Sequence, residues 1–227
     1  MLLTVPPSLR PFAATKPAGR LPAEAVFPPG TSLPEICAHC WIVDNATPPS
    51  ERVRILDEIA AKASRNPLIV ALAQDVAARV PMPDGPHDHA AMLAQGVLDL
   101  LPSLVEYRPD PNGYEVFLTV EWTFGGGADG GLGTEVSPIT GKPKGAGDCE
   151  DLATAYAALM LALGVPARVK WWDQPGAQLN HVSALVQLQP GGPWLPAETT
   201  IPGARLGEDP YQALARSRSG LESRVFG

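Results

Sequence analysis

A single apolar helix followed by three short strands dominates the last third of the chain. Apolar residues recur along residues 149–163 at the spacing of one buried helical stripe, at positions 152, 155, 156, 159, 160 and 163. Asp148 precedes this run as a candidate N-cap, and Gly164 and Pro166 end it in the order expected at a helix C-terminus. Cys149 therefore occupies the first position of the predicted helix.

The position of Cys149 predicts a reactive thiol. Its side chain is expected to share the inward face of the helix with Leu152 and Tyr156. The unpaired N–H groups and the positive end of the helix dipole at this terminus favour a thiolate over a thiol. Because the thiolate is the nucleophilic form of cysteine, we interpret Cys149 as a candidate nucleophile.

The strands that follow bring two more candidate residues toward this thiol. They are predicted at residues 167–172, 181–188 and 194–198, with turns between them. A helix followed by antiparallel strands allows Cys149, His181 and Glu198 to meet at one edge of the sheet. A neutral His181 ring would then take the thiol proton, while the carboxylate holds the ring in the required tautomer.

Four sequence blocks in this order resemble the transglutaminase-like superfamily. They are Gly147-Asp148-Cys149-Glu150-Asp151-Leu152-Ala153, Leu163-Gly164-Val165-Pro166-Ala167-Arg168, His181-Val182, and Trp194 through Glu198-Thr199. The resemblance implies a papain-like cysteine fold in which Cys149 is the nucleophile, His181 the base and Glu198 the orienting acid. The usual acid of the family is Asp, and Glu198 is one methylene longer.

A weaker resemblance extends upstream, to transglutaminase-like proteins encoded in phage and prophage genomes. It rests on predicted helices across residues 50–100, the run 105–110, Glu115, and Ser137-Pro138. Those proteins often carry Gln just before the Ser-Pro pair as a candidate oxyanion donor, and this chain has Val136 there. The sequence therefore assigns no oxyanion donor beyond the backbone N–H of Cys149.

Proline shapes the start of the chain. Many of the 26 prolines lie in the first 50 residues, too closely spaced for a helix or a central strand. Residues 1–50 are therefore predicted to form an extended arm with little core of its own. We expect a partner protein or a neighbouring subunit to bind this arm.

Helical spacing then recurs in three segments, which predict a helical subdomain at residues 50–64, 67–79 and 89–101. A turn at 107–113, a strand at 114–124 and a glycine-rich loop at 125–147 are expected next. The predicted fold class is α+β. Its predicted parts are an arm at 1–50, a helical subdomain at 51–113 and a transglutaminase-like domain at 114–227.

Composition and charge indicate which classes of partner the protein can bind and in which compartment it is expected. The net charge of −7 argues against nucleic-acid binding, and no apolar run approaches the roughly 18 residues of a membrane span. The first residues lack a secretory pattern, and three cysteines favour free thiols in a reducing compartment. We expect a cytoplasmic protein, or a virion-associated one if it is phage-encoded.

Two groups of residues raise the question of a metal. Asp148, Glu150 and Asp151 form an acidic cluster, which we interpret as charge at a helix N-terminus. The Cys37-Ala-His39-Cys40 motif offers zinc ligands that the His87-Asp88-His89 segment would complete, but it lacks a second cysteine pair. The glycine-rich loop also lacks the pattern of a phosphate-binding loop. We therefore expect neither a metal nor a cofactor.

Two functions of different classes remain open. The first is a thiol acyl-transfer enzyme (a peptidase, amidase or transglutaminase) that forms a thioester on Cys149 of a protein or peptide acyl group. The second is a phage-type virion or assembly component that uses the same fold as an interaction module. The Cys149 and His181 pair favours the first function, and the proline-rich arm favours the second.

Overall fold

The computed structural model describes residues 40–43, 47–81, 86–110, 115–125, 135–141, 143–172 and 181–225. Most of the predicted arm lies outside the described residues, together with Cys37 and His39 of the zinc motif. The arm's partner and the zinc motif therefore stay predictions. Within residues 1–50, Cys40–Val43 form a strand, and Val43 is buried.

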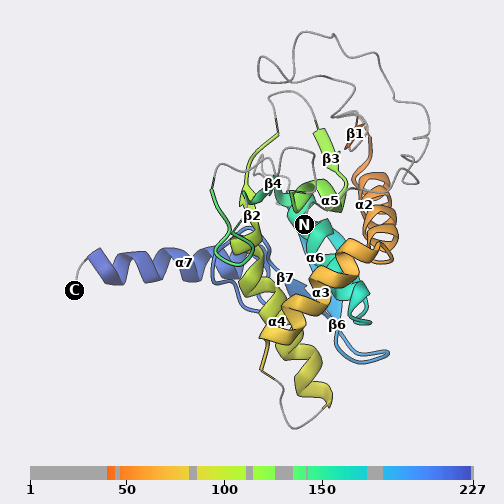
Figure 1. Ribbon diagram of the computed structural model, residues 1–227. Coiled ribbons are helices and arrows are strands. Elements are labelled where there is room, and N and C mark those ends of the chain that lie inside the picture. Colours follow the sequence, from red (N-terminus) through yellow and green to blue (C-terminus); the bar gives the residue numbers. More distant parts are fainter. Residues whose placement is uncertain are drawn as a thin grey trace.

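The elements follow one another in a mixed order of helices and strands (Figure 1). The helices are α2 (Pro49–Ala63), α3 (Pro67–Arg79), α4 (Pro86–Leu104), α5 (Val120–Thr123), α6 (Cys149–Ala162) and α7 (Pro210–Val225). The strands are β1 (Cys40–Val43), β2 (Val105–Tyr107), β3 (Glu115–Leu118), β4 (Gly145–Gly147), β5 (Ala167–Trp172), β6 (His181–Gln187) and β7 (Trp194–Ala197). The α+β class is as predicted, and the three helical segments between residues 50 and 101 are confirmed.

Helix α6 lies at the centre of the molecule. Helices α2, α3, α4 and α5 pack on it, and strands β5 and β6 pack on it as well (Figure 1). Every residue from Glu150 to Met160 is buried. The prediction of a single buried stripe is therefore wrong: the helix is enclosed by helices and sheet together. Its four alanines between 153 and 158 let these neighbours approach closely.

The helical segment and the C-terminal segment share one hydrophobic core. Side chains such as Leu56, Val76 and Leu101 from the first segment belong to the same cluster as Tyr156 and Val182 from the second. Tyr156 is fully buried, and its hydroxyl donates to the backbone oxygen of Ala94 at 2.9 Å. The boundaries predicted at residues 50 and 113 stay predictions.

The main sheet is antiparallel in the order β5-β6-β7. Trp172 pairs with His181 at one end of β5 and β6, and Ala184 pairs with Ala197 of β7. Because β7 runs antiparallel to β6, the residue after Ala197 lies beside the beginning of β6. This register brings Glu198 next to His181.

A parallel pair of short strands leads into the helix. Strand β2 pairs with β4 in the register Val105↔Gly145 to Tyr107↔Gly147, and α6 begins two residues after β4. A Cβ atom at Gly145 would lie 1.6 Å from the backbone oxygen of Thr123, so only glycine fits here. Strands β1 and β3 form a separate antiparallel pair.

Two segments differ from the sequence prediction. The strand expected at residues 114–124 ends at Leu118, and residues 120–123 form the helical turn α5. Val120 and Thr123 lie three residues apart, so a helical turn buries both where a strand would point them to opposite faces. The glycine-rich loop expected at 125–147 includes the strand β4 at its end.

Helix α7 was not predicted, and it extends away from the rest of the molecule (Figure 1). Its start carries a reciprocal cap, in which the backbone N–H of Gln212 donates to Asp209 Oδ1 and the N–H of Asp209 donates to Gln212 Oε1. This Asp-x-x-Gln spacing is a sequence signal that would have indicated the helix. No described helix is both long and apolar enough to span a membrane.

Candidate active site

The start of α6 holds Cys149 through its neighbours on both sides. Asp148 occupies the N-cap position, but its side chain makes no capping hydrogen bond. Asp151 supplies the other half of a capping box, because its carboxylate accepts from the backbone N–H of Asp148, and its Oδ1 also accepts from the N–H of Leu118 at 2.7 Å. A Cβ at Gly147 would lie 2.5 Å from Asp151 Cβ, so this approach requires glycine. The Gly-Asp-Cys-x-Asp spacing thus has a structural cause.

The Cys149 thiol donates its hydrogen to a neighbouring carboxylate. Its Sγ lies 2.8 Å from Glu150 Oε2. Burial, and then the charges of Glu150 and Asp148, raise the pKa of the Cys149 thiol above its usual value of 9.0, although the backbone N–H of Val182 acts in the opposite direction. The expectation that the helix terminus lowers this pKa is therefore wrong, since burial and two adjacent acidic groups outweigh the helix dipole.

His181 and Glu198 are joined directly. His181 Nε2 lies 2.7 Å from Glu198 Oε2, and the Glu198 side chain is fully buried. The other oxygen, Oε1, accepts from the backbone N–H and the hydroxyl of Thr200, at 2.8 and 2.6 Å. Glu198 therefore spans the distance to the ring with its extra methylene, and Thr200 fixes its orientation.

The environment of Glu198 keeps it ionised. Burial would raise the pKa of Glu198, but the hydrogen bonds and charge of His181 and the hydrogen bonds of Thr200 outweigh burial, so the pKa lies below its usual value of 4.5. An ionised carboxylate only accepts hydrogen bonds. His181 must therefore carry a hydrogen on Nε2 toward Glu198, and in the neutral ring the lone pair lies on Nδ1.

The predicted residues lie at one end of the fold, although not all of them are bonded to one another. The N–H of Val182, the residue after His181, faces the Cys149 sulfur, so the thiol lies against the start of β6. Within the described ranges, however, the hydrogen-bond partner of the thiol is Glu150 and not His181. The structure thus places Cys149 against the strand that carries His181. The thiol hydrogen, however, points toward the Glu150 carboxylate and not toward the His181 ring.

A cluster of acidic side chains surrounds this thiol, and sequence reasoning recognised only part of it. The cluster comprises Asp110, Glu115, Asp148, Glu150 and Asp151. The last three come from the helix start, whereas Asp110 lies between β2 and β3 and Glu115 is the first residue of β3. Both belong to the upstream resemblance, which assigns them no structural role.

Glu150 is the ionised centre of the cluster. Burial would raise the pKa of Glu150, but hydrogen bonds from Glu115, Asp148 and Cys149 outweigh it, and the pKa is lowered. Burial and the bond to Glu150 raise the pKa of Glu115 to about 8, and Arg52 Nη1 lies 3.1 Å from its Oε1. Burial likewise raises the pKa of Asp110 to about 7. The carboxyl groups therefore share protons, with Glu150 as the common acceptor.

Two further residues flank this region. Tyr107, the last residue of β2, is about half exposed, and burial of its hydroxyl, together with the negative charge of Glu150, raises its pKa to about 12. Val136 is 63% exposed and forms a bridge with Pro143, so its side chain supplies no oxyanion donor. Ser137 is buried, and its hydroxyl oxygen accepts hydrogen bonds from the backbone N–H groups of Ile139 and Thr140.

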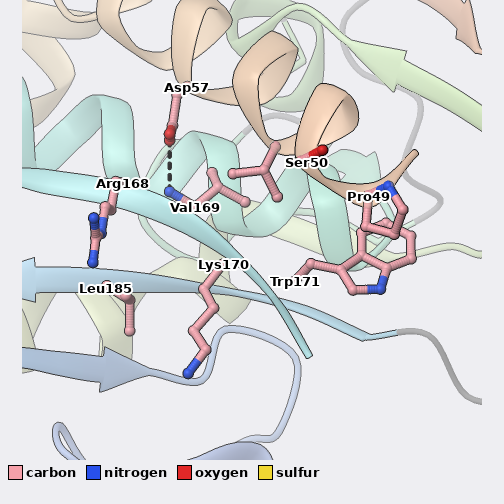
Figure 2. A pocket seen from close by; sticks show the side chains of 9 residues that line it. Pro49, Ser50, Asp57, Arg168, Val169, Lys170, Trp171 and Leu185 are labelled. Atoms are coloured by element: carbon pink, nitrogen blue, oxygen red, sulfur yellow. Dashed lines mark hydrogen bonds between the residues drawn. The ribbon is translucent and has the colours of Figure 1, made fainter. Parts of the chain in front are cut away.

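A surface pocket lies on a different part of the molecule (Figure 2). It lies between the start of α2 and the strand β5, and none of Cys149, His181 and Glu198 lines it. Asp57 accepts from the backbone N–H of Val169 at 2.7 Å across this pocket, as the dashed line in Figure 2 marks. This bond caps the free edge of β5, so we interpret the pocket as part of the framework.

Comparison with known families identifies the region that carries the site. The family model of the transglutaminase-like superfamily matches residues 134–199, which include Cys149, His181 and Glu198. Comparisons with curated proteins and with solved structures found no match for the chain. The match covers α6 and the antiparallel sheet that packs on it, the arrangement expected from the resemblance. Residues 134–199 therefore form a transglutaminase-like region within this chain.

Proposed function

We propose that this protein is a thiol acyl-transfer enzyme that acts on a protein or peptide acyl donor. Cys149 is the nucleophile, His181 is the general base, and Glu198 orients the imidazole. The superfamily supports cysteine acyl transfer or peptidase chemistry in general. The choice between hydrolysis and transamidation depends on whether water or an amine reaches the thioester.

The hydrogen bond between His181 and Glu198 carries this proposal. At 2.7 Å from an ionised carboxylate, Nε2 holds the ring hydrogen, and Nδ1 keeps the lone pair that a base requires. Nδ1 has no hydrogen-bond partner in the described part of the chain. The lone pair is therefore available to the thiol that lies against the same strand.

The reaction then balances over two steps. The Cys149 sulfur attacks the acyl carbonyl, its proton passes to His181 Nδ1, and the tetrahedral intermediate forms. Collapse breaks the bond to the leaving group, which takes the proton from His181 and leaves a thioester on Cys149. Water or an amine next attacks the thioester, with His181 again accepting and returning one proton.

The raised pKa of the thiol favours proton transfer during the attack over a preformed thiolate. A thiol that donates to Glu150 is stable as the neutral form in the resting protein. The sulfur must first turn from Glu150 toward His181, or lose its proton as the acyl group arrives. We expect substrate binding to promote this change, since it displaces water from the same region.

Acylation of Cys149 by an activated ester tests the proposal. We would use a C37S/C40S background, in which Cys149 is the only thiol, and p-nitrophenyl acetate as the probe. The expected result is one acetyl group per chain by intact mass, attached at Cys149 and removed by hydroxylamine. His181→Ala is expected to slow acylation at least about a thousandfold.

His89→Ala is the matched control, because His89 lies near the start of α4, at the far end of that helix from β2. It should acylate at the rate of the background variant. Equal acylation of the His181→Ala and background proteins would contradict the role of His181. Acylation elsewhere than Cys149 would contradict the role of the thiol.

The alternative function, that of a phage-type virion or assembly component, stays a prediction. It depended on residues 1–50, of which the structure describes 40–43 and 47–50, and on the resemblance to phage-encoded proteins. The pairing of β1 with β3 anchors the end of this segment to the body of the molecule. No described contact favours a particular partner for it.

A further inference from the structure

We propose that Asp148, Cys149 and Glu150 form a binding site for Zn²⁺, and that the bound cation blocks the thiol. The zinc site rests on different observations from the acyl-transfer function. It depends on the geometry of the ligand atoms and not on His181. It changes the interpretation of the acidic residues, which the sequence alone suggested were only charge at a helix terminus.

The three side chains each bring one possible ligand atom to the same small region. One atom from each of the three side chains lies within 4.8 Å of the other two, a sulfur and two carboxylate oxygens. Zinc binds thiolate, imidazole and carboxylate ligands, and a site with three protein ligands keeps a fourth position for water or substrate. The mixture of one sulfur with two oxygens favours Zn²⁺ over Ca²⁺ and Mg²⁺, which take oxygen ligands alone.

A second observation is an unpartnered oxygen in the same place. Asp148 is 8% exposed, and although its carboxyl group hydrogen-bonds to Glu150, its Oδ1 atom is buried without a hydrogen-bond partner. Other carboxylates of the cluster have donors: Asp151 Oδ1 accepts from the backbone N–H of Leu118, and Asp110 Oδ2 accepts from that of Val116. A buried acceptor without a donor is costly, and a cation would satisfy it.

The surroundings orient the proposed ligands. Glu115 hydrogen-bonds to Glu150, and Arg52 in turn lies 3.1 Å from Glu115, so the Glu150 carboxylate is held from behind. Asp151 holds the backbone of Asp148 at the helix start. Such outer contacts fix the direction of metal ligands and strengthen binding.

Binding would exchange two protons for the metal, one from the Cys149 thiol and one from the Asp148 carboxyl group, because both groups donate a hydrogen bond to Glu150 in the metal-free protein. The Cys149 thiol loses its hydrogen to the buffer as the sulfur coordinates Zn²⁺, and the hydrogen bond from Sγ to Glu150 is replaced by coordination of both groups. The sulfur lone pair is then engaged with the metal. Cys149 cannot attack a carbonyl or an alkylating agent until Zn²⁺ leaves.

The test measures metal and thiol directly. In the C37S/C40S background, which removes the separate cysteine motif, Zn²⁺ would be titrated by calorimetry. Co²⁺ would be added as a spectroscopic probe, because a thiolate ligand gives it an intense charge-transfer band in the near ultraviolet. Labelling of Cys149 by iodoacetamide would be followed with and without Zn²⁺.

We expect one Zn²⁺ per chain, a Co²⁺ charge-transfer band, and labelling of Cys149 that slows at least about tenfold when Zn²⁺ is bound. Cys149→Ser should lose the band. Asp148→Asn and Glu150→Gln should each weaken Zn²⁺ binding at least about tenfold. The control Asp75→Asn removes an exposed carboxylate of α3 that pairs with Arg79, and it should bind as the background does.

Three results would overturn the proposal: no saturable binding to the folded background protein, binding that leaves Cys149 labelling unchanged, or a Co²⁺ spectrum without the thiolate band. Because these measurements use the background protein, they hold even if a carboxylate variant fails to fold. None of them requires acyl transfer, so failure of the proposed enzyme activity would leave this test intact.

Discussion

Glu198 Oε2 lies 2.7 Å from His181 Nε2, and the carboxylate that makes this contact is completely buried. The contact decides the tautomer of the ring, because an ionised carboxylate can only accept. Its partner Thr200 holds the second oxygen through two hydrogen bonds. This region of the site is therefore rigid before any substrate arrives.

The first prediction concerns the length of this acid. Glu198→Asp shortens the side chain by one methylene and restores the residue usual in the family, but the backbone around Thr200 is arranged for Glu. We expect kcat/KM of the proposed acyl-transfer activity to fall about tenfold or more, because the ring loses its orienting contact. Steady-state kinetics on both proteins would measure the change.

Glu198→Gln separates charge from shape in the same experiment. Its amide nearly matches the carboxylate in size but lacks the charge that stabilises the imidazolium, so we expect a larger loss than in Glu198→Asp. Circular dichroism would check that both variants fold. A Glu198→Asp protein with unchanged kcat/KM would show that the contact to His181 has no catalytic importance.

The second prediction concerns the thiol. Glu150→Gln removes the negative charge next to the sulfur, and its charge contributes to the raised pKa of Cys149. The pKa should fall, and the rate of iodoacetamide labelling at neutral pH should rise about tenfold in metal-free buffer. Glu58→Gln, which changes an exposed carboxylate paired with Arg54, should label at the original rate. Slower labelling of Glu150→Gln would contradict this role.

The third prediction concerns pH and stability. The pKa of Asp110 is about 7 in the folded protein, against a usual 3.8, so the folded state binds this proton more tightly than the unfolded chain does. Its stabilising contribution is complete below about pH 4 and is lost as the pH rises toward about 7. Asp110→Asn stays neutral throughout, so its stability relative to the wild type should increase with pH.

Urea unfolding at pH 5 and at pH 8 would measure this difference. We expect the change in relative stability between the two conditions to be on the order of 1–3 kcal/mol, with the variant gaining at pH 8. The amide oxygen can still accept the hydrogen bond from the backbone of Val116, so the comparison isolates the charge. A difference that does not vary with pH would exclude the raised pKa.

The fourth prediction concerns the strand that leads into α6. A Cβ at Gly145 would lie 1.6 Å from a backbone oxygen of Thr123, and backbone cannot move aside as a side chain can. Gly145→Ala should therefore lower the free energy of unfolding by about 3 kcal/mol. Gly203→Ala is the matched control, with a φ of +73° and open space around it, and should cost about 1 kcal/mol. Equal losses would contradict the close packing of β4 against α5.

Short-range sequence patterns correctly predicted most of the helices and strands. The helix from Cys149, the strands that begin at Ala167, His181 and Trp194, and the three earlier helices all follow from hydrophobic spacing, caps and turn residues, which act over a few residues. The same pattern failed for Val120–Thr123, because the choice between strand and helical turn there depends on which neighbours bury the two side chains. Helix α7 carries a local capping signal, the Asp-x-x-Gln spacing of Asp209 and Gln212.

The order of Cys149, His181 and Glu198, and the helix and strands that carry them, were determined by the sequence alone. Only the tertiary structure decided the ionisation of the thiol and of the carboxylates. Asp110 and Glu115 meet the start of α6 through the pairing of β2 with β4 and the packing of β3, contacts that no local pattern contains. The charges that raise the pKa of Cys149 belong to its neighbours in sequence, Asp148 and Glu150, but the burial that raises this pKa most depends on how the distant helices and strands pack around the thiol.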